Sequence, residues 1–224
     1  EDLKRKTYEY FNIQKDIQYI PNFIDINLYN REYDQKLRDD FIGLEQFLIT
    51  HISNFRKVKR VDDVIRIFEK ISKIIPSKLL MIGDGPERIK AEQLCRKLGL
   101  DNKVEFLGKI RVVEKILAIS DLFILPSQTE SFGLVALEAM ASMNAIISTN
   151  SGGISEVNID SKTGFLSDVG DVDKMADDAI KLLQDPILLD CFKKNALKLA
   201  ANFSLEKVLP KYITIYQELC QTKK

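Results

Sequence analysis

Two glutamates eight positions apart, Glu130 and Glu138, are the side chains of this sequence with the clearest capacity for chemistry. The apolar run before Glu130 gives way to a polar loop, and a helix rich in Ala and Leu is predicted to begin near position 131 or 132. The first N–H groups of a helix lack intrahelical partners and lie at the positive end of its dipole, which suits a diphosphate. The loop residues that we expect to contact such a ligand are Ser131, Phe132, Gly133 and Leu134.

The two carboxylates are predicted to act separately. If both lay along that helix, eight residues of rise would separate them by about 12 Å, which is too far for an acid/base pair. We therefore expect two hydroxyl acceptors, one near each end of an elongated ligand. Glu138 stands in the apolar stretch 137–141, where a carboxylate without a function would be costly. The alternative is a solvated helix residue.

A cluster of cations follows the predicted strand 46–52. Asn54 opens this loop, and four of the next residues are basic: Arg56, Lys57, Lys59 and Arg60. In an open α/β sheet ligands bind beyond the carboxyl ends of the strands, so this position favours a phosphate-sized anion site. A solvated basic turn is the alternative.

Three further loops carry glycines after predicted strands. Gly83-Asp84-Gly85-Pro86 resembles the start of a dinucleotide fingerprint, but Arg88 replaces the third glycine, and Pro86 is expected to begin the next helix. The pair Gly152-Gly153 lets the backbone fold close to a ligand, although a plain turn would use glycines too. The residues of these loops that we count as candidate contacts are Gly83, Gly85, Gly108, Lys109 and Ile110.

Composition excludes several kinds of site. Lys plus Arg and Asp plus Glu are both 33, so no global basic field for nucleic acid exists. The single histidine, His51, excludes two-His metal sites, and its place in a predicted strand favours a packed or hydrogen-bonded structural role. Three widely spaced cysteines indicate reduced thiols and a cytoplasmic location. We predict no metal ion and no cofactor.

The elements that position these loops alternate between short apolar runs and helical periods. Positions 61, 64, 65, 68, 71 and 75 are apolar at helical spacing, for example. Such alternation predicts a doubly wound α/β fold, Rossmann-like, with a parallel sheet covered on both faces. The predicted strands are 46–52, 78–82, 104–107, 122–125 and 145–148, and after position 166 only helices are predicted, at 171–184, 187–202 and 204–220.

The two ends of the chain fall outside this pattern. Residues 1–20 are predicted to form a helix and a strand, residues 21–43 a linker, residues 44–203 the α/β domain, and residues 204–224 a C-terminal helix. The chain opens without Met, so we expect it to begin inside a longer protein. No apolar stretch is long enough for a transmembrane segment, and no secretory signal is seen.

Four motifs with a specific order and spacing lie within residues 44–166. They are Gly83-Asp84-Gly85-Pro86, Phe106-Leu107-Gly108, Glu130-x7-Glu138 around Ser131-Phe132-Gly133, and Gly152-Gly153-Ile154-Ser155-Glu156. Together they resemble the retaining glycosyltransferases of the GT-B fold, a family that includes glycogen and sucrose synthase-like enzymes. The stretches 20–25 and 52–61 are most similar to those members of the family that join N-acetylglucosamine to L-malate in bacillithiol biosynthesis.

The resemblance implies the C-terminal, donor-binding half of a two-domain enzyme that uses UDP-N-acetylglucosamine without a metal and retains the anomeric configuration. It implies that Glu138 holds the ribose, Glu130 the sugar hydroxyls, the loop amides the phosphates and sugar, and Lys59 with an arginine the leaving diphosphate. Many members have that arginine where Asn54 stands here, so Arg56 is the nearest substitute. The acceptor would bind the missing N-terminal domain, and residues 204–220 would pack back toward it.

Other functions fit parts of the pattern. A nucleotide-sensing module would need the same phosphate loop, but Glu130 would have no function in it. A dehydrogenase is disfavoured because the glycine fingerprint is incomplete. A nucleic-acid binder would rest only on the cations of 56–60. Within the glycosyltransferases, a lipid or a growing polysaccharide is the alternative acceptor, and a homo-oligomer stays open.

Overall fold

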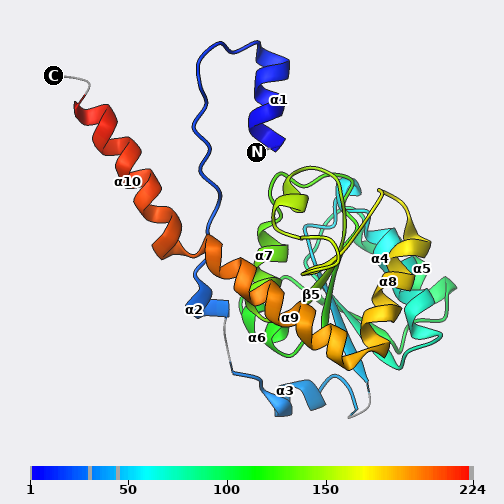
Figure 1. Cartoon of the computed structure of the whole chain (residues 1–224). Coiled ribbons are helices and arrows are strands. Elements are labelled where there is room, and N and C mark those ends of the chain that lie inside the picture. The colour runs from blue at the N-terminus through cyan, green and yellow to red at the C-terminus, as the bar shows by residue number, and fades with distance from the viewer. Residues whose placement is uncertain (1, 30–31, 44–45, 222–224) are drawn as a thin grey trace.

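Six parallel strands form one sheet in the order β3-β2-β1-β4-β5-β6 (Figure 1). The computed structural model describes residues 2–29, 32–43 and 46–221. The strands are β1 Phe47–Ile52, β2 Ser77–Ile82, β3 Val104–Gly108, β4 Leu122–Leu125, β5 Ala145–Thr149 and β6 Gly164–Ser167. The predicted α/β fold is confirmed. Strand β6 was not predicted, because its apolar run is only two residues long and it begins with glycine.

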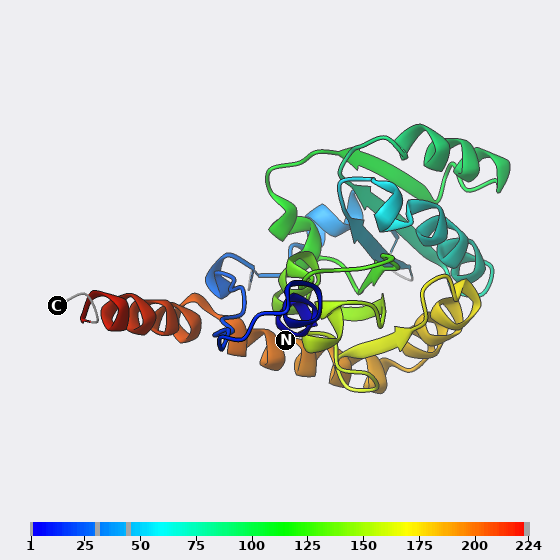
Figure 2. The ribbon, with the colours of Figure 1, turned by 90° about the horizontal axis from the view of Figure 1, so that it is seen from above.

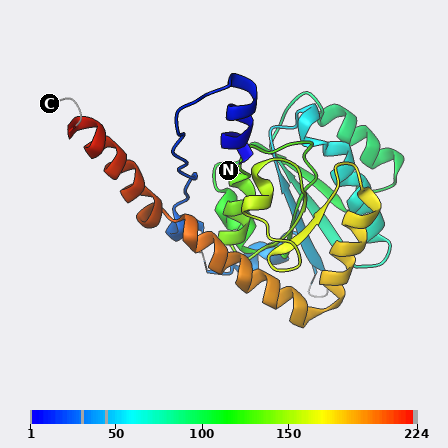
Figure 3. The ribbon, with the colours of Figure 1, turned by 45° about the horizontal axis from the view of Figure 1, so that its top comes forward.

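Helices cover both faces of this sheet. One face carries α4 (Val61–Ser72), α5 (Arg88–Lys97) and α8 (Val172–Gln184), and the other carries α6 (Val113–Ala118) and α7 (Leu134–Ala141). Successive strand side chains point to opposite faces, so Leu122 and Ile124 join the first core while Phe123 joins the second. Helix α9 (Pro186–Ala200) passes from α8 to α7 and contributes to both cores, as Figure 3 shows. Near-continuous apolar strands are therefore buried on both sides.

The strand order places a crevice between β1 and β4. Along the chain, connections run outward from β1 through β2 to β3, and then return to build β4, β5 and β6 on the other side. Loops that leave neighbouring strands in opposite directions open a cleft at the carboxyl ends, which is where ligands bind in such sheets. The cation loop after β1 and the Glu130 loop after β4 flank this point.

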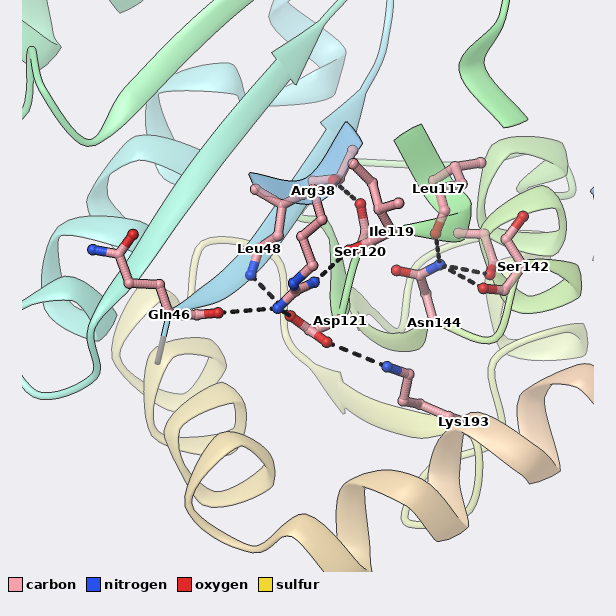
Figure 4. A network of polar contacts seen from close by, with 12 residues as sticks. Arg38, Gln46, Leu48, Leu117, Ile119, Ser120, Asp121, Ser142, Asn144 and Lys193 are labelled. Atoms are coloured by element: carbon pink, nitrogen blue, oxygen red, sulfur yellow. Dashed lines mark hydrogen bonds and ion pairs between the residues drawn. The ribbon is translucent and has the colours of Figure 1, made fainter. Parts of the chain in front are cut away.

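The predicted linker 21–43 contains two short helices, α2 (Ile26–Tyr29) and α3 (Gln35–Asp39). Asp34 caps α3, since its side chain accepts the Leu37 N–H at 3.0 Å. Arg38 of α3 then reaches the amino edge of the sheet, where it pairs with Asp121 at 2.7 Å and donates to the Ile119 carbonyl (Figure 4). The linker is thus attached to the α/β domain at the amino ends of its strands. The predicted domain start, residue 44, lies outside the described residues.

The two ends of the chain flank the carboxyl edge and the side of the domain. Helix α1 (Asp2–Phe11) lies above α7, and Glu156 accepts hydrogen bonds from the Asp2 N–H at 3.0 Å and the Tyr19 hydroxyl at 2.9 Å. The strand predicted within 1–20 is wrong: the described residues 12–23 have no neighbouring strand to pair with. Helix α10 (Leu205–Gln221) projects away from the sheet (Figure 2). Across the described residues, no helix is long and apolar enough to cross a membrane.

Candidate donor-binding site

An ion pair joins the two loops at the crevice. Lys59 Nζ lies 2.5 Å from Glu130 Oε1, and the buried hydroxyl of Ser127 donates to the same oxygen at 2.7 Å. Both side chains are largely buried, with exposed fractions of 19% for Lys59 and 10% for Glu130. Both hydrogen bonds end on Oε1, and the described residues give Oε2 no hydrogen-bond partner. The pair therefore combines a cation with an acceptor that a ligand hydroxyl can use.

The cation loop owes its shape to two residues in the left-handed region. Phe55 has φ 36° and Arg60 has φ 48°, conformations that most side chains disfavour and that concentrate at functional sites. Phe55 is fully buried, which fixes one end of the loop, and the Arg60 guanidinium pairs with Asp63 at 2.6 Å, which fixes the other. The Gln128 N–H donates to the Val58 carbonyl at 2.8 Å. Lys59 is consequently held beside the loop after β4.

Only one of the four clustered cations lines the crevice. Lys59 does so, Arg60 is engaged by Asp63, and Arg56 and Lys57 are exposed. Asn54 is also exposed. The role of Arg56 at the diphosphate and the role of Asn54 in donor binding therefore stay predictions, and Lys59 is the cation of this cluster that lines the cavity.

Helix α7 begins later than the sequence predicted. It starts at Leu134, because Gly133 takes a left-handed conformation with φ 89° and serves as the N-cap. The predicted start at 131 or 132 is therefore wrong, and the first-turn N–H groups belong to Leu134 and Val135 rather than to Phe132 and Gly133. The 12 Å separation of the two glutamates assumed a continuous helix and no longer applies. A side chain on Gly133 would collide with Ile154, whose Cδ1 would lie 2.5 Å from the new Cβ.

The paired glycines serve the site indirectly. A Cβ on Gly152 would lie 2.2 Å from the Glu130 carbonyl oxygen, and one on Gly153 would lie 2.2 Å from that of Ser131. The Gly153 N–H donates to the Glu130 carbonyl at 2.7 Å. The turn thus lies close to the loop that carries Glu130, and its contact with a ligand stays a prediction.

The glycines after β2 also have a packing role. A Cβ on Gly83 would lie 1.8 Å from the Ser53 carbonyl oxygen, and one on Gly85 would lie 2.1 Å from that of Asn54. These glycines let the loops after β1 and β2 touch. Their direct contact with a ligand stays a prediction, as does that of Gly108, Lys109 and Ile110 after β3. Pro86 does not begin α5 as expected, because it lies in the turn before Arg88.

Glu138 lies further along α7, half-buried beside Tyr29 of α2. Burial raises the pKa of the Glu138 carboxyl, and a hydrogen bond from the Tyr29 hydroxyl acts in the opposite direction. Burial, followed by the charge of Glu138, raises the pKa of Tyr29, so its phenol stays protonated and donates. Glu138 is therefore partly buried, and the alternative of a fully solvated helix residue is wrong.

The single histidine has the structural role that we expected. His51 is fully buried, with Nδ1 2.8 Å from the Ile124 carbonyl oxygen and Nε2 2.8 Å from the Ser53 hydroxyl. A carbonyl only accepts, so Nδ1 carries the proton and Nε2 accepts from Ser53. Burial lowers the His51 pKa to about 4, and the ring is neutral at pH 7. It orients Ser53, which lines the crevice.

These groups meet in one cavity of about 420 Å³ at the carboxyl edge. Its lining residues are Asn22, Ile52, Ser53, Lys59, Glu130, Ser131, Phe132, Gly133, Leu134, Val135 and Glu138. The sequence assigned no role to three of these residues, Asn22, Ser53 and Val135, or to Ser127, which lies behind Glu130. Ser53 and Ser127 are single hydroxyl residues after strands, and no sequence pattern distinguishes such residues. No three His, Cys, Asp or Glu side chains of the described part of the chain are grouped to hold a metal ion.

Comparison with known sequences identifies relatives that share most of the chain. The chain is 43% identical over 99% of its length to N-acetyl-alpha-D-glucosaminyl L-malate synthase of Bacillus anthracis, of which it covers 59%. It is 32% identical over 66% of its length to 2-deoxystreptamine N-acetyl-D-glucosaminyltransferase of Niallia circulans, of which it covers 39%. The chain thus spans about three-fifths or less of the length of these curated relatives.

Known structures share the arrangement of the sheet and helices. Anabaena HepE, solved in complex with UDP and glucose, superposes with a TM-score of 0.77 at 26% identity, over 92% of this chain and 56% of HepE. This supports the GT-B architecture. Residues 33–199 match the family described as glycosyl transferases group 1. This chain therefore belongs to the glycosyl transferases group 1 family.

Proposed function

We propose that the chain is the donor-binding part of a retaining glycosyltransferase that moves N-acetylglucosamine from UDP-N-acetylglucosamine to the hydroxyl of L-malate. The observation that carries the donor site is the Lys59–Glu130 pair in one cavity with Glu138. The choice of sugar and acceptor rests on the relative that is 43% identical and is named for both. A lipid or polysaccharide acceptor is the alternative within the family.

The cavity gives each part of a nucleotide sugar a matching group. Glu138 accepts the ribose hydroxyls, and Oε2 of Glu130 accepts hydroxyls of the sugar ring. Lys59 and the first N–H groups of α7 meet the diphosphate, with Arg56 at the mouth of the loop. On diphosphate binding, Lys59 shares its protons between Glu130 and the phosphate oxygens.

Stabilisation of the leaving group is the physical centre of the proposed reaction. As the bond from sugar to phosphate breaks, negative charge accumulates on the diphosphate, and fixed donors that need no rearrangement lower the barrier. The acceptor hydroxyl attacks from the face that the phosphate leaves, and the departing phosphate takes its proton. No enzyme nucleophile is required, and no divalent cation is invoked.

We propose that the acceptor binds outside this chain, which covers 59% of the relative that is named for L-malate. We propose that residues 1–20 are the tail of an N-terminal acceptor domain, that 21–43 link it to the donor domain 44–203, and that 204–224 pack back toward it. Exposed apolar side chains along α10 support this packing: Leu209, Ile213, Tyr216 and Leu219.

Calorimetry in the presence of a chelator tests the donor site. We expect UDP and UDP-N-acetylglucosamine to bind without divalent metal, the sugar nucleotide more tightly, and Lys59→Met to weaken both. Strict metal dependence would contradict the proposed chemistry. Equal affinity for the two ligands would instead favour a non-catalytic nucleotide-binding module.

Assays of UDP release test the activity. We expect the full-length enzyme to turn over with L-malate in a panel of hydroxy acids, lipids and oligosaccharides. The 224-residue chain should be inert, because the acceptor oxygen must be held about 3 to 3.5 Å from the sugar carbon and only one wall of the cleft is present. Comparable turnover by this chain would mean that the acceptor site lies within it.

A further inference from the structure

The hydroxyl of Ser127 contacts Glu130 from outside the donor cavity. Ser127 follows β4 by two residues and is fully buried, and it is not among the residues that line the cavity. Its Oγ lies 2.7 Å from Glu130 Oε1, and the ionised carboxylate only accepts, so the serine is the donor. A hydroxyl has a single proton, and here that proton is given to Glu130.

Hydrogen bonds to the end of β5 fix the backbone that carries both residues. The Thr149 hydroxyl donates to the Ser127 carbonyl at 2.6 Å. The Glu130 N–H donates to the Ser151 carbonyl at 3.2 Å, and the Glu130 carbonyl accepts the Gly153 N–H at 2.7 Å. Both ends of the step from Ser127 to Glu130 are therefore bonded to the same neighbouring segment, so the hydroxyl and the carboxylate are held on a fixed backbone.

The two donors to Glu130 Oε1 differ in what else they can bind. Lys59 Nζ lies 2.5 Å from this oxygen, but Lys59 also lines the cavity and is 19% exposed. An incoming diphosphate therefore competes with Glu130 for the protons of the lysine. Ser127 is fully buried, so neither the ligand nor bulk solvent competes for its hydroxyl. Of the two contacts, the one with Ser127 is expected to remain unchanged when the donor binds.

We propose that Ser127 is a positioning residue for Glu130: it keeps Oε1 in place in the donor complex, so that Oε2 stays available to the hydroxyls of the transferred sugar. This inference rests on the proposed function, because it assumes that Glu130 accepts hydrogen bonds from the sugar. A carboxylate with one oxygen already fixed loses less conformational freedom when the ligand arrives than a mobile carboxylate does. Ser127 should therefore contribute to recognition of the sugar and not of the nucleotide.

The test is calorimetry of Ser127→Ala with UDP-N-acetylglucosamine and with UDP. The affinity for the sugar nucleotide should fall by about fivefold, while that for UDP stays within about twofold. Ser127→Cys keeps most of the side-chain volume but has only a weak donor, and it should show the same selective loss. A loss confined to the alanine variant would indicate packing instead of positioning, and would overturn the proposal.

Ser120→Ala is the matched control. Ser120 lies two residues before β4, as Ser127 lies two residues after it, and it is also buried, with an exposed fraction of 3%. Its hydroxyl donates to the Ile116 carbonyl at 2.7 Å, at the opposite edge of the sheet from the cavity. Its variant should bind both ligands normally, and urea unfolding of both alanine variants shows how much stability each loses. Selective loss of the sugar nucleotide in Ser120→Ala would overturn the proposal, because general loosening of β4 would then explain the effect.

A double substitution distinguishes positioning of Glu130 from an independent role. In a Glu130→Ala background, Ser127→Ala should weaken binding of the sugar nucleotide little further, because the carboxylate to be positioned is already gone. A full additional loss, or an equal loss for both ligands, would overturn the proposal. If the unaltered chain bound UDP-N-acetylglucosamine no more tightly than UDP, the proposed function would fail and the role of Ser127 with it. If it preferred the sugar nucleotide and Ser127→Ala kept that preference, only the role of Ser127 would fail.

Discussion

The two edges of the sheet each hold a largely buried carboxylate beside a cation, but they use it differently. At the amino edge, Asp121 Oδ2 accepts from Arg38 at 2.7 Å and from the Leu48 N–H at 2.9 Å, while Oδ1 accepts from Lys193 at 3.4 Å (Figure 4). At the carboxyl edge, both contacts of Glu130 fall on a single oxygen. One carboxylate has both oxygens engaged, and the other has one left for a ligand.

The number of engaged oxygens distinguishes a buried carboxylate that stabilises the fold from one that is available to a ligand. Asp121 joins three distant parts of the chain, namely α3, β1 and α9, so its hydrogen bonds contribute to the fold. Glu130 and Glu138 line a cavity instead, and burial there raises the pKa of the Glu138 carboxyl. We expect substitutions at the two edges to have opposite effects on stability and binding.

Asp121→Ala should give the largest effect, on stability alone. It leaves the Arg38 guanidinium without its carboxylate partner and the Leu48 N–H without its side-chain acceptor, at a site where Asp121 is only 14% exposed. We expect the free energy of unfolding to fall by about 3 kcal/mol. Urea unfolding measures this, and calorimetry on the folded variant should return an unchanged affinity for UDP. A stable variant that no longer bound UDP would break the proposed division between the edges.

Glu138→Gln should show the reverse. It removes a ribose acceptor charge, so the affinities for UDP and UDP-N-acetylglucosamine should fall alike by about 10- to 100-fold. Because the folded pKa of Glu138 is raised, its ionised form destabilises the folded state above that pKa, and stability rises as the pH falls through it. The neutral glutamine should therefore unfold at a higher urea concentration at pH 7.5. Lower stability together with normal UDP binding would assign Glu138 to the fold instead.

Glu130→Ala should affect one ligand only. Its free oxygen is proposed to meet the sugar, so the affinity for UDP-N-acetylglucosamine should fall by about tenfold while that for UDP stays within about twofold. Parallel calorimetric titrations with the two ligands measure the difference. An equal loss for both would mean that Glu130 acts on the nucleotide through Lys59.

The sequence predicted five of the six strands for a physical reason that the structure confirms. Four of the predicted strands are mostly apolar and are buried along most of their length, as parallel strands covered on both faces require. Lys59 and Glu130 follow strands of one parallel sheet, and their loops therefore emerge at the same edge. The alternation of elements predicted that edge, although the roles of the two side chains came from family resemblance.

What could not be predicted depends on contacts between residues far apart in the chain. The start of α7 was placed too early, because nothing local shows that Gly133 adopts a left-handed cap against Ile154. The packing role of the loop glycines was not predicted, because the backbone segments that Gly83 and Gly153 admit are distant from them in the sequence. Similarly, no periodicity links Tyr29 to Ser142, whose hydroxyl donates to the Tyr29 carbonyl only once α2 packs beside the end of α7.

Lys193→Met should give the smallest effect on the free energy of unfolding. It compares the two cationic partners of Asp121 at the amino edge, Lys193 and Arg38. Lys193 is the weaker of the two cationic partners of Asp121, since its Nζ lies 3.4 Å away and its side chain is 21% exposed. Asp121 keeps Arg38 and the Leu48 N–H, so no buried charge loses its partner, and the methionine retains the apolar part of the side chain. We expect the free energy of unfolding to fall by about 0.5 kcal/mol, less at high salt, with UDP affinity unchanged. Urea unfolding at two salt concentrations measures both the size and the screening. A loss as large as that of Asp121→Ala would show that Lys193, rather than Arg38 and the backbone, supplies the stabilising contact at this edge.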